Sequence, residues 1–217
     1  MASGLKRDPL VSAVFLVLVS LSAQYLSALT RISFEPSFIY SSFGQDGSVK
    51  ASKHTETSRG RNVPIPESLG TIRNFSVGDR IYFGGQPSAD DLALLQKRGV
   101  STVVNLRGQD EMDALGFDER RAVIKLGMGY IHLPLTKGSV LSDEEINRIL
   151  DVVGDTGKAP IILHCASSNR SGYIWAMYRA LRGHVETNEA IRQGEAAGLR
   201  SDILKQRARV FISRNRR

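Results

Sequence analysis

The stretch PIILHCASSNRSG, residues 160–172, leads from an apolar run through a short polar loop into a helical pattern. Its first five residues are apolar enough to form a strand inside a sheet that is covered on both faces. Apolar residues then recur at helical spacing from Ile174 to Leu181, and Gly183 is a typical residue at a helix end. The sequence therefore predicts a buried strand, a loop at its carboxyl end and a helix.

The same alternation of strand-like and helical patterns extends upstream to about Leu69 and indicates an α/β layer fold. Further strands are expected at residues 80–83, 101–106 and 129–133. Helices are expected after Ser88, a good N-cap, after Ser142, which forms a capping box with Glu145, and twice more near the C-terminus. We expect one small domain with a mostly parallel central sheet flanked by helices.

The chain has 217 residues, room for one domain with appendages. Residues 9–30 carry no charge and as a helix are long enough to cross a membrane, so residues 1–31 are predicted to be a transmembrane anchor or a signal segment. Residues 32–68 are rich in Ser, Gly, Pro and Thr and read as a flexible linker. Residues 69–217 form the predicted catalytic domain with a basic tail.

The distribution of charge predicts on which side of a membrane the domain lies and argues against a nucleic-acid partner. Lys6 and Arg7 precede the apolar segment, which predicts a single-pass membrane protein with its domain on the non-cytoplasmic side, or a secreted one if the segment is cleaved. The net charge is +7, but residues 200–217 alone hold seven Lys or Arg and one Asp. We expect a solvated basic tail and no nucleic-acid partner.

The chemistry is expected in the loop after the strand. Cys165 is the only cysteine, so no internal disulfide forms, and its place at a helix N-terminus favours the thiolate. The loop amides can surround an anion, the Arg170 fork can hold two of its oxygens, and Ser171 can hydrogen-bond the sulfur. No histidine has metal-ligand spacing, and no metal or cofactor is expected.

The sequence HCASSNRS, residues 164–171, resembles the signature of cysteine-dependent protein tyrosine and dual-specificity-like phosphatases. VGDRIYFGGQPSADDL (77–92) and GVSTVVNLR (99–107) resemble the opening of the phosphatase-like domain of beta-lactamase-hydrolase-like proteins. The resemblance implies a hydrolase acting on a phosphorylated protein or a small phosphate ester, with Cys165 as nucleophile of a phosphocysteine intermediate and Arg170 on the phosphate. The predicted substrate-binding residues are Ala166, Ser167, Ser168, Asn169, Arg170 and Ser171.

Two features of the loop keep other functions open. Cys165 and Arg170 are spaced C-x4-R, one residue shorter than usual in phosphatases and shared with rhodanese sulfurtransferases, so a Cys165 persulfide is the alternative chemistry. Ser168 stands where glycine is usual, and a positive φ there would carry a penalty. His164 is expected to be a buried residue that supports the loop.

The general acid of such phosphatases would fall near Thr136 or Lys137, where the sequence has no carboxylate. Asp110, Glu111 and Asp143 are the substitutes, each also explained as a solvated or helix-capping acid. Without an acid the domain would be a catalytically weak phosphate-binding module.

Overall fold

The computed structural model describes residues 63–78, 80–136 and 141–216. They contain a six-stranded sheet in the order β1-β2-β3-β6-β4-β5. Its strands are β1 (Ile65–Pro66), β2 (Ser76–Val77), β3 (Ile81–Gly84), β4 (Thr102–Asn105), β5 (Gly129–His132) and β6 (Ile161–His164). The last four are parallel neighbours, whereas β1 and β2 extend the sheet antiparallel. The predicted mostly parallel sheet is confirmed.

Strand β6 is the centre of this sheet and all four of its residues are buried. Side chains alternate across a strand, so Ile161 and Leu163 belong to one hydrophobic cluster and Ile162 to the other. His164, the last residue of β6, lies in register with Gly84 and Asn105 at the ends of its two neighbours. Three strand ends therefore meet directly before Cys165.

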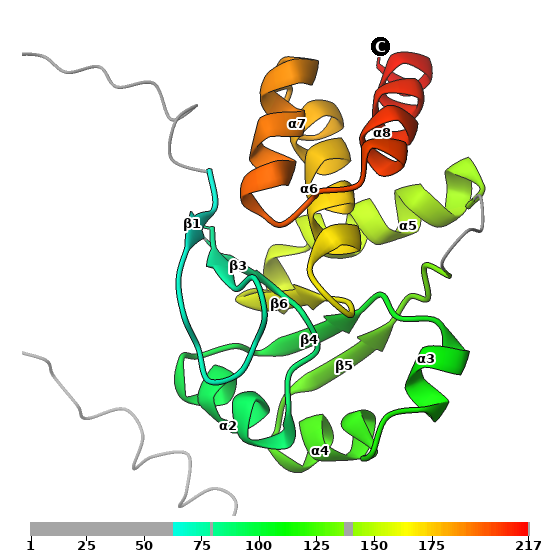
Figure 1. The fold of residues 1–217 in the computed structure, drawn as a ribbon. Helices are drawn as coiled ribbons and strands as arrows, with labels where there is room; N and C mark the ends of the chain where they lie inside the picture. Colours follow the sequence, from blue (N-terminus) through cyan, green and yellow to red (C-terminus); the bar gives the residue numbers. More distant parts are fainter. Residues whose placement is uncertain (1–62, 79, 137–140, 217) are drawn as a thin grey trace, which may run out of the picture. The chain divides into compact units, whose positions relative to one another are not determined.

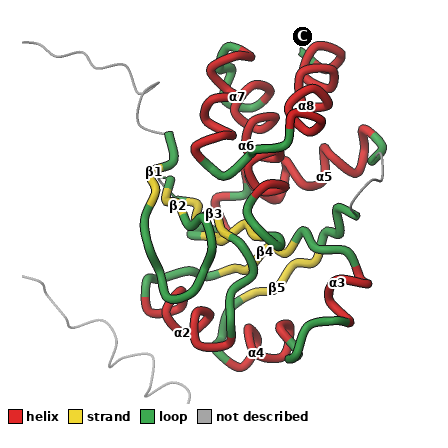
Figure 2. The backbone as a smooth tube through the Cα atoms, viewed as in Figure 1, coloured by secondary structure: helices red, strands yellow, loops and turns green. Residues whose placement is uncertain are grey.

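Helices cover both faces of the sheet (Figure 1). One cluster joins α2 and α4 to the Ile162 face, and the other joins α5, α6, α7 and α8 to the opposite face. Figure 2 shows the strands as a layer between these two groups. The helices are α2 (Ala89–Lys97), α3 (Gln109–Asp113), α4 (Glu119–Lys125), α5 (Asp143–Gly154), a 3₁₀ turn (Thr156–Lys158), α6 (Asn169–Leu181), α7 (Thr187–Ala196) and α8 (Asp202–Asn215).

The helix boundaries follow local side-chain chemistry. Ser88 Oγ accepts a hydrogen bond from Asp91 N at 3.1 Å, and Ser142 Oγ accepts one from Glu145 N at 3.2 Å. Both predicted N-caps are thus confirmed, and each satisfies a backbone N–H that has no partner inside its helix.

The sheet begins upstream of Leu69, because β1 lies within the segment predicted as a linker. Among the described residues, no helix is both long and apolar enough to cross a membrane. The predicted anchor or signal at residues 1–31 and most of the linker fall outside the described ranges.

Candidate active site

Cys165 lies at the carboxyl edge of the parallel strands, where open α/β sheets place their ligand sites. It follows β6 directly, its side chain is buried, and its backbone N–H donates to Gly84 O at 3.3 Å. Helix α6 begins four residues later at Asn169. The predicted strand, loop and helix are confirmed, with the sulfur at the base of the loop.

Ser168 gives the loop its sharp turn into α6. It adopts the left-handed conformation, with φ of 67° and ψ of −5°, and its hydroxyl donates to Ala197 O at 2.7 Å. That conformation costs about 1–2 kcal/mol for a residue with a side chain. A buried hydrogen bond contributes about 1 kcal/mol to stability. The bond from Ser168 to Ala197 O therefore offsets much of the conformational penalty that the sequence predicted for a positive φ at Ser168.

The same bond leaves the start of α6 without a capping side chain. Ser88, Ser142 and Ser201 each accept a hydrogen bond from the first turn of their helices, but the hydroxyl of Ser168 faces away from α6 toward Ala197. The first N–H groups of a helix lack partners within it, and they favour an anion. No side chain therefore caps the start of α6, a position that favours an anion.

Neighbouring segments hold the loop in this shape. Asn74 Nδ2 donates to Ser167 O at 3.0 Å, and Gly85 forms an isolated β-bridge with Ser167. Asn169 Oδ1 accepts from the backbone N–H groups of Arg200 and Ser201 at 2.7 and 3.1 Å. Ser171 Oγ is buried and has no hydrogen-bond partner among the residues that the structure describes. Ser171, in the first turn of α6, thus has a hydroxyl that forms no hydrogen bond within the described residues.

Arg170 is held by the Glu111 carboxylate and by two backbone carbonyls, Leu135 O and, at 3.3 Å from Nη1, Leu106 O. Its Nη1 and Nη2 donate to Glu111 Oε2 and Oε1 at 2.5 and 2.7 Å, and Nη1 also donates to Leu135 O at 2.9 Å. Burial opposes the charge, but the Glu111 carboxylate and the Cys165 sulfur outweigh it and raise the pKa of Arg170 above its ordinary value. The guanidinium is therefore charged and oriented beside the sulfur.

The three substitute acids lie in different surroundings. The hydrogen bonds from Arg170 lower the pKa of Glu111 to about 2, so Glu111 is ionised near neutral pH and is excluded as a proton donor. Asp143 Oδ1 accepts from Arg214 Nη2 at 2.7 Å and is tied to α8. Asp110 is exposed, and a Cβ added to Gly108 would lie 2.6 Å from Asp110 Oδ1 and 3.5 Å from Thr136 Oγ1. Asp110 is thus next to the position expected for the acid.

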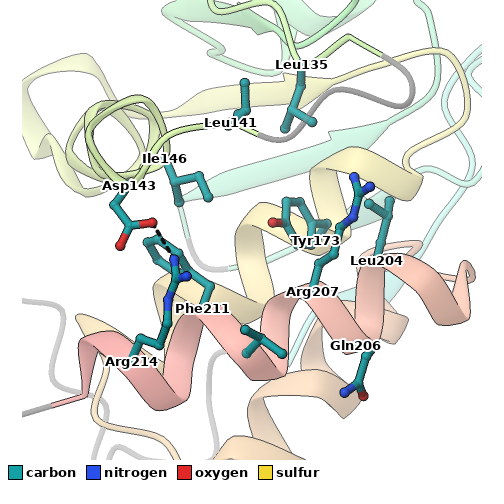
Figure 3. Close-up of a pocket in the computed structure, with 11 residues that line it drawn as sticks. Leu135, Leu141, Asp143, Ile146, Tyr173, Leu204, Gln206, Arg207, Phe211 and Arg214 are labelled. Carbon is teal, nitrogen blue, oxygen red and sulfur yellow. Dashed lines mark hydrogen bonds and ion pairs between the residues drawn. The ribbon is translucent and has the colours of Figure 1, made fainter.

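A groove adjoins this site between α5, α6 and α8 (Figure 3). Leu135, whose carbonyl holds Arg170, and Tyr173, one turn after Arg170, are among its lining residues. The ion pair of Asp143 with Arg214 closes one end of it. Asp143 therefore lines the groove and forms an ion pair with Arg214 of α8, and this ion pair does not involve Arg170.

His164 is fully buried as predicted, and its Nε2 lies 3.3 Å from Glu119 Oε1. The sequence did not single out Glu119. It is the first residue of the seven-residue helix α4, where an acid normally faces solvent and complements the helix dipole. Only the packing of α4 on the sheet brings this carboxylate next to His164, the residue before Cys165.

A cysteine loop at the end of a central parallel strand, followed by an arginine in the first turn of a helix, defines the dual-specificity-phosphatase-like class of folds. The crystal structure of TpbA from Pseudomonas aeruginosa aligns with a TM-score of 0.56 and 22% identity, over 72% of this chain and 92% of that one. The active form of Tk-PTP aligns with a TM-score of 0.54 and 18% identity, over 63% of this chain and 92% of that chain.

Sequence comparison then gives the family. The chain belongs to the family described as DSP-PTPase phosphatase fused to NAD+ kinase, whose model matches residues 54–210. A probable chloroplastic NAD kinase 2 of Oryza sativa subsp. japonica is 28% identical over 151 residues, which are 65% of this chain and 15% of that protein. The match includes the phosphatase-related part of the chain, and the predicted resemblance is confirmed.

Two bacterial relatives agree with this assignment. A beta-lactamase hydrolase-like protein of Xylella fastidiosa strain 9a5c is 25% identical over 129 residues, 58% of this chain and 30% of that protein. The dual specificity protein phosphatase TpbA of Pseudomonas aeruginosa strain UCBPP-PA14 is 25% identical over 143 residues, 65% of this chain and 62% of that protein. The chain thus spans less than two thirds of each of these relatives.

Proposed function

We propose that the chain hydrolyses phosphate monoesters through a phosphocysteine intermediate on Cys165. The observation that carries this proposal is the uncapped start of α6 beside the sulfur, with the Arg170 guanidinium already oriented by Glu111. Both groups present N–H donors to one anion, which suits the equatorial oxygens of a transferring phosphoryl group. TpbA has been crystallised in complex with phosphotyrosine, which supports an aryl phosphate as substrate.

The reaction takes two displacements. The Cys165 thiolate attacks phosphorus, the S–P bond forms as the ester P–O bond breaks, and the leaving oxygen takes a proton. Water then attacks phosphorus, a P–O bond forms as the S–P bond breaks, and the proton of the water returns to the acid that donated one in the first displacement, which releases inorganic phosphate and restores the thiolate. Ser171 Oγ, buried without a partner among the described residues, donates to the sulfur as it leaves. No redox step is involved.

Asp110 is the proposed proton donor of the first displacement. It is the one substitute acid with neither an arginine nor a lysine bonded to its carboxylate in the described ranges, and it lies beside Gly108 and Thr136 at the Glu111 end of the site. Asp110→Asn should slow esters with poor leaving groups more than those with good ones, because only the former need the proton. Equal slowing of alkyl and nitrophenyl esters would assign Asp110 another role.

Hydrolysis of an aryl phosphate by the purified full-length chain tests the function. We expect phosphate release that Cys165→Ser abolishes, while Glu67→Gln, in an exposed ion pair with Arg98, leaves it unchanged. A thiosulfate-to-cyanide assay on the same preparation covers the persulfide alternative. Thiocyanate formation without phosphate release would overturn the proposal in favour of sulfur transfer. No activity in either assay would favour a phosphate-binding module without catalysis.

We also propose that residues 9–30 tether the domain to a membrane or direct its export. The support is the uncharged stretch of 22 residues preceded by Lys6 and Arg7. Cell fractionation with alkaline carbonate extraction tests it. Retention in the membrane pellet that is lost on deleting residues 1–31 is expected of an anchor, and a shortened chain outside the cell is expected of a cleaved signal. A full-length chain in the soluble fraction would contradict both.

A further inference from the structure

Helix α3 carries Glu111, the acid that holds Arg170, yet apolar packing does not fix this helix. It has five residues, and none of them is buried. A helix of this length is not stable by itself, and most helices in proteins are stabilised by packing of an apolar face. Polar contacts must therefore keep α3, and with it the Glu111 carboxylate, in place.

Arg107, which directly precedes the start of α3, makes contacts of this kind. Its side chain is only 14% exposed, its Nη2 donates to Glu111 O at 3.0 Å, and its Nε lies 3.7 Å from Glu111 Oε1. One guanidinium thus contacts both the backbone and the carboxylate of Glu111. The planar fork of arginine suits this, because it offers several donors in fixed directions.

Arg107 is itself anchored outside α3. Its Nη1 donates to Gln86 Oε1 at 2.7 Å, and Gln86 Nε2 donates to Glu119 Oε1 at 2.5 Å, a carboxylate that is 1% exposed. The backbone of Arg107 donates to Asn105 Oδ1 and accepts from His132 Nε2, each at 2.7 Å. The ends of β4 and β5 and the start of α4 therefore set the place of Arg107.

Glu111 connects two guanidinium groups. Its two oxygens accept from Arg170 at 2.5 and 2.7 Å, while Arg107 holds the same residue from the other side. Without Arg107, Glu111 would keep the hydrogen bond from Gly108 N to its Oε2 at 2.9 Å, but α3 would lose its link to the sheet through Gln86. The loss of Arg107 should thus weaken the support of Arg170 without abolishing it.

We propose that Arg107 is a positioning residue for Arg170: it fixes α3 so that the Glu111 carboxylate presents the Arg170 guanidinium to the phosphate group of the substrate. The inference rests on the proposed function, since it concerns the residue that binds phosphate there. Two alternatives predict other behaviour. An Arg107 that only stabilises the fold would leave the phosphate affinity of the folded chain unchanged, and an Arg107 that contacts phosphate directly would act independently of Glu111.

Calorimetric titration of the full-length chain with inorganic phosphate tests this. Arg170→Met should abolish the binding, which identifies the signal of this site. We expect Arg107→Met to raise the dissociation constant by about tenfold, as for the loss of roughly one hydrogen bond to a charged group. Arg120→Met, the matched control at an exposed arginine of α4, should not change it. An unchanged constant in Arg107→Met, or binding that persists in Arg170→Met, would overturn the proposal.

A double variant separates positioning from direct contact. Arg107→Met combined with Glu111→Gln should bind phosphate no more weakly than Glu111→Gln alone, because both changes act through the same support of Arg170. Additive losses of affinity would show that Arg107 reaches phosphate by a route that does not include Glu111. That result would refute the positioning role.

Arg107→Lys separates the fork from the charge and keeps the proposal testable if Arg107→Met does not fold. Lysine retains the positive charge but cannot hold Gln86 and Glu111 in one planar fork, so phosphate binding should again weaken. The parent affinity in Arg107→Lys would contradict the proposal. The titration needs no turnover, so the expected changes in affinity without ester hydrolysis would count against the proposed function alone, whereas a parent chain that binds no phosphate would count against both.

Discussion

Arg170 is oriented before any substrate arrives. Its two terminal nitrogens are held by the Glu111 carboxylate and its Nη1 also by Leu135 O, so little reorganisation remains when an anion binds. Charge-assisted bidentate pairs are among the stronger side-chain interactions. At the scale of single residues, the orientation of Arg170 depends on the Glu111 carboxylate.

Glu111→Gln should weaken catalysis without removing the nucleophile. The variant loses the charged bidentate pair with Arg170, and a hydrogen bond to a charged group contributes about 1.5–3 kcal/mol. We expect kcat/KM for an aryl phosphate to fall by about 10- to 100-fold. The matched control on the same helix is Asp113→Asn, whose carboxylate accepts a hydrogen bond from the exposed Gln109 amide. A full rate in Glu111→Gln would show that Arg170 needs no support.

The same pair predicts an acid-dependent stability. The pKa of Glu111 is lowered from 4.5 to about 2 in the folded chain, so the folded state favours its ionised form. Its contribution is complete above about pH 4.5 and is lost as the pH falls toward 2. Urea unfolding between these values should show a smaller loss of stability in Glu111→Gln than in the parent chain. An equal loss in both chains would contradict the assignment.

At the scale of elements, the loop is positioned by the crossing of α6 and α7. A Cβ on Gly172 would lie 2.4 Å from both Gly194 O and Leu199 N, so the two helices meet at backbone distance. Gly198, with φ of 106°, packs against Ser168 at the end of the same contact. The start of α6 is thus fixed by the helix behind it as well as by the strand before it.

Gly172→Ala should loosen this crossing. The added methyl group meets backbone atoms that cannot move aside singly, and overpacking of this kind costs about 1–3 kcal/mol. Denaturant unfolding of Gly172→Ala should show that loss, whereas Gly116→Ala, which meets no atom within 4 Å, should stay near the parent stability. Equal stabilities for the two variants would place the helices further apart.

Ser168 offers a test of backbone conformation at the loop. Both Ser168→Ala and Ser168→Gly lose the hydrogen bond to Ala197 O, but only glycine adopts a φ of 67° without strain. We expect the glycine variant to be more stable than the alanine variant by about 1 kcal/mol. Thermal unfolding of the pair measures this difference, and a more stable alanine variant would exclude the left-handed turn.

At the scale of the whole molecule, the sheet is asymmetric. The parallel strands β3, β4 and β6 are mostly buried between two helix layers, whereas β1 and β2 form an antiparallel edge in which both residues of β1 are exposed. This edge is bound by the pairing of Ile65 with Val77 and by the Glu67–Arg98 ion pair. It therefore contributes to stability without taking part in the cysteine loop.

A chain that starts at Leu69 should be less stable than one that starts at His54. The shorter chain lacks β1 and the exposed ion pair, which together contribute on the order of 1 kcal/mol. Urea midpoints of residues 54–217 and 69–217 measure this, and aryl phosphate turnover should be the same in both. An equal midpoint would show that the edge strand adds nothing.

Local patterns predicted the parallel strands, the helix caps at Ser88 and Ser142 and the cysteine loop, because each depends on residues within a few positions of one another. The two-residue strands β1 and β2 and the short helices α3 and α4 were not predicted, since segments of two to seven residues show too little periodicity. The membrane anchor or signal segment at residues 1–31 lies outside the described residues and stays a prediction.

The sequence by itself determined where the proposed nucleophile Cys165 and the proposed phosphate-binding residue Arg170 lie, since both belong to one short segment between a strand and the first turn of a helix. Only the tertiary structure showed which partners the acids Glu111 and Glu119 have. Glu111 reaches Arg170 across 59 positions, and Glu119 meets His164 only when α4 packs against the sheet. Such contacts depend on how the elements are packed, and spacing along the chain carries no signal for them.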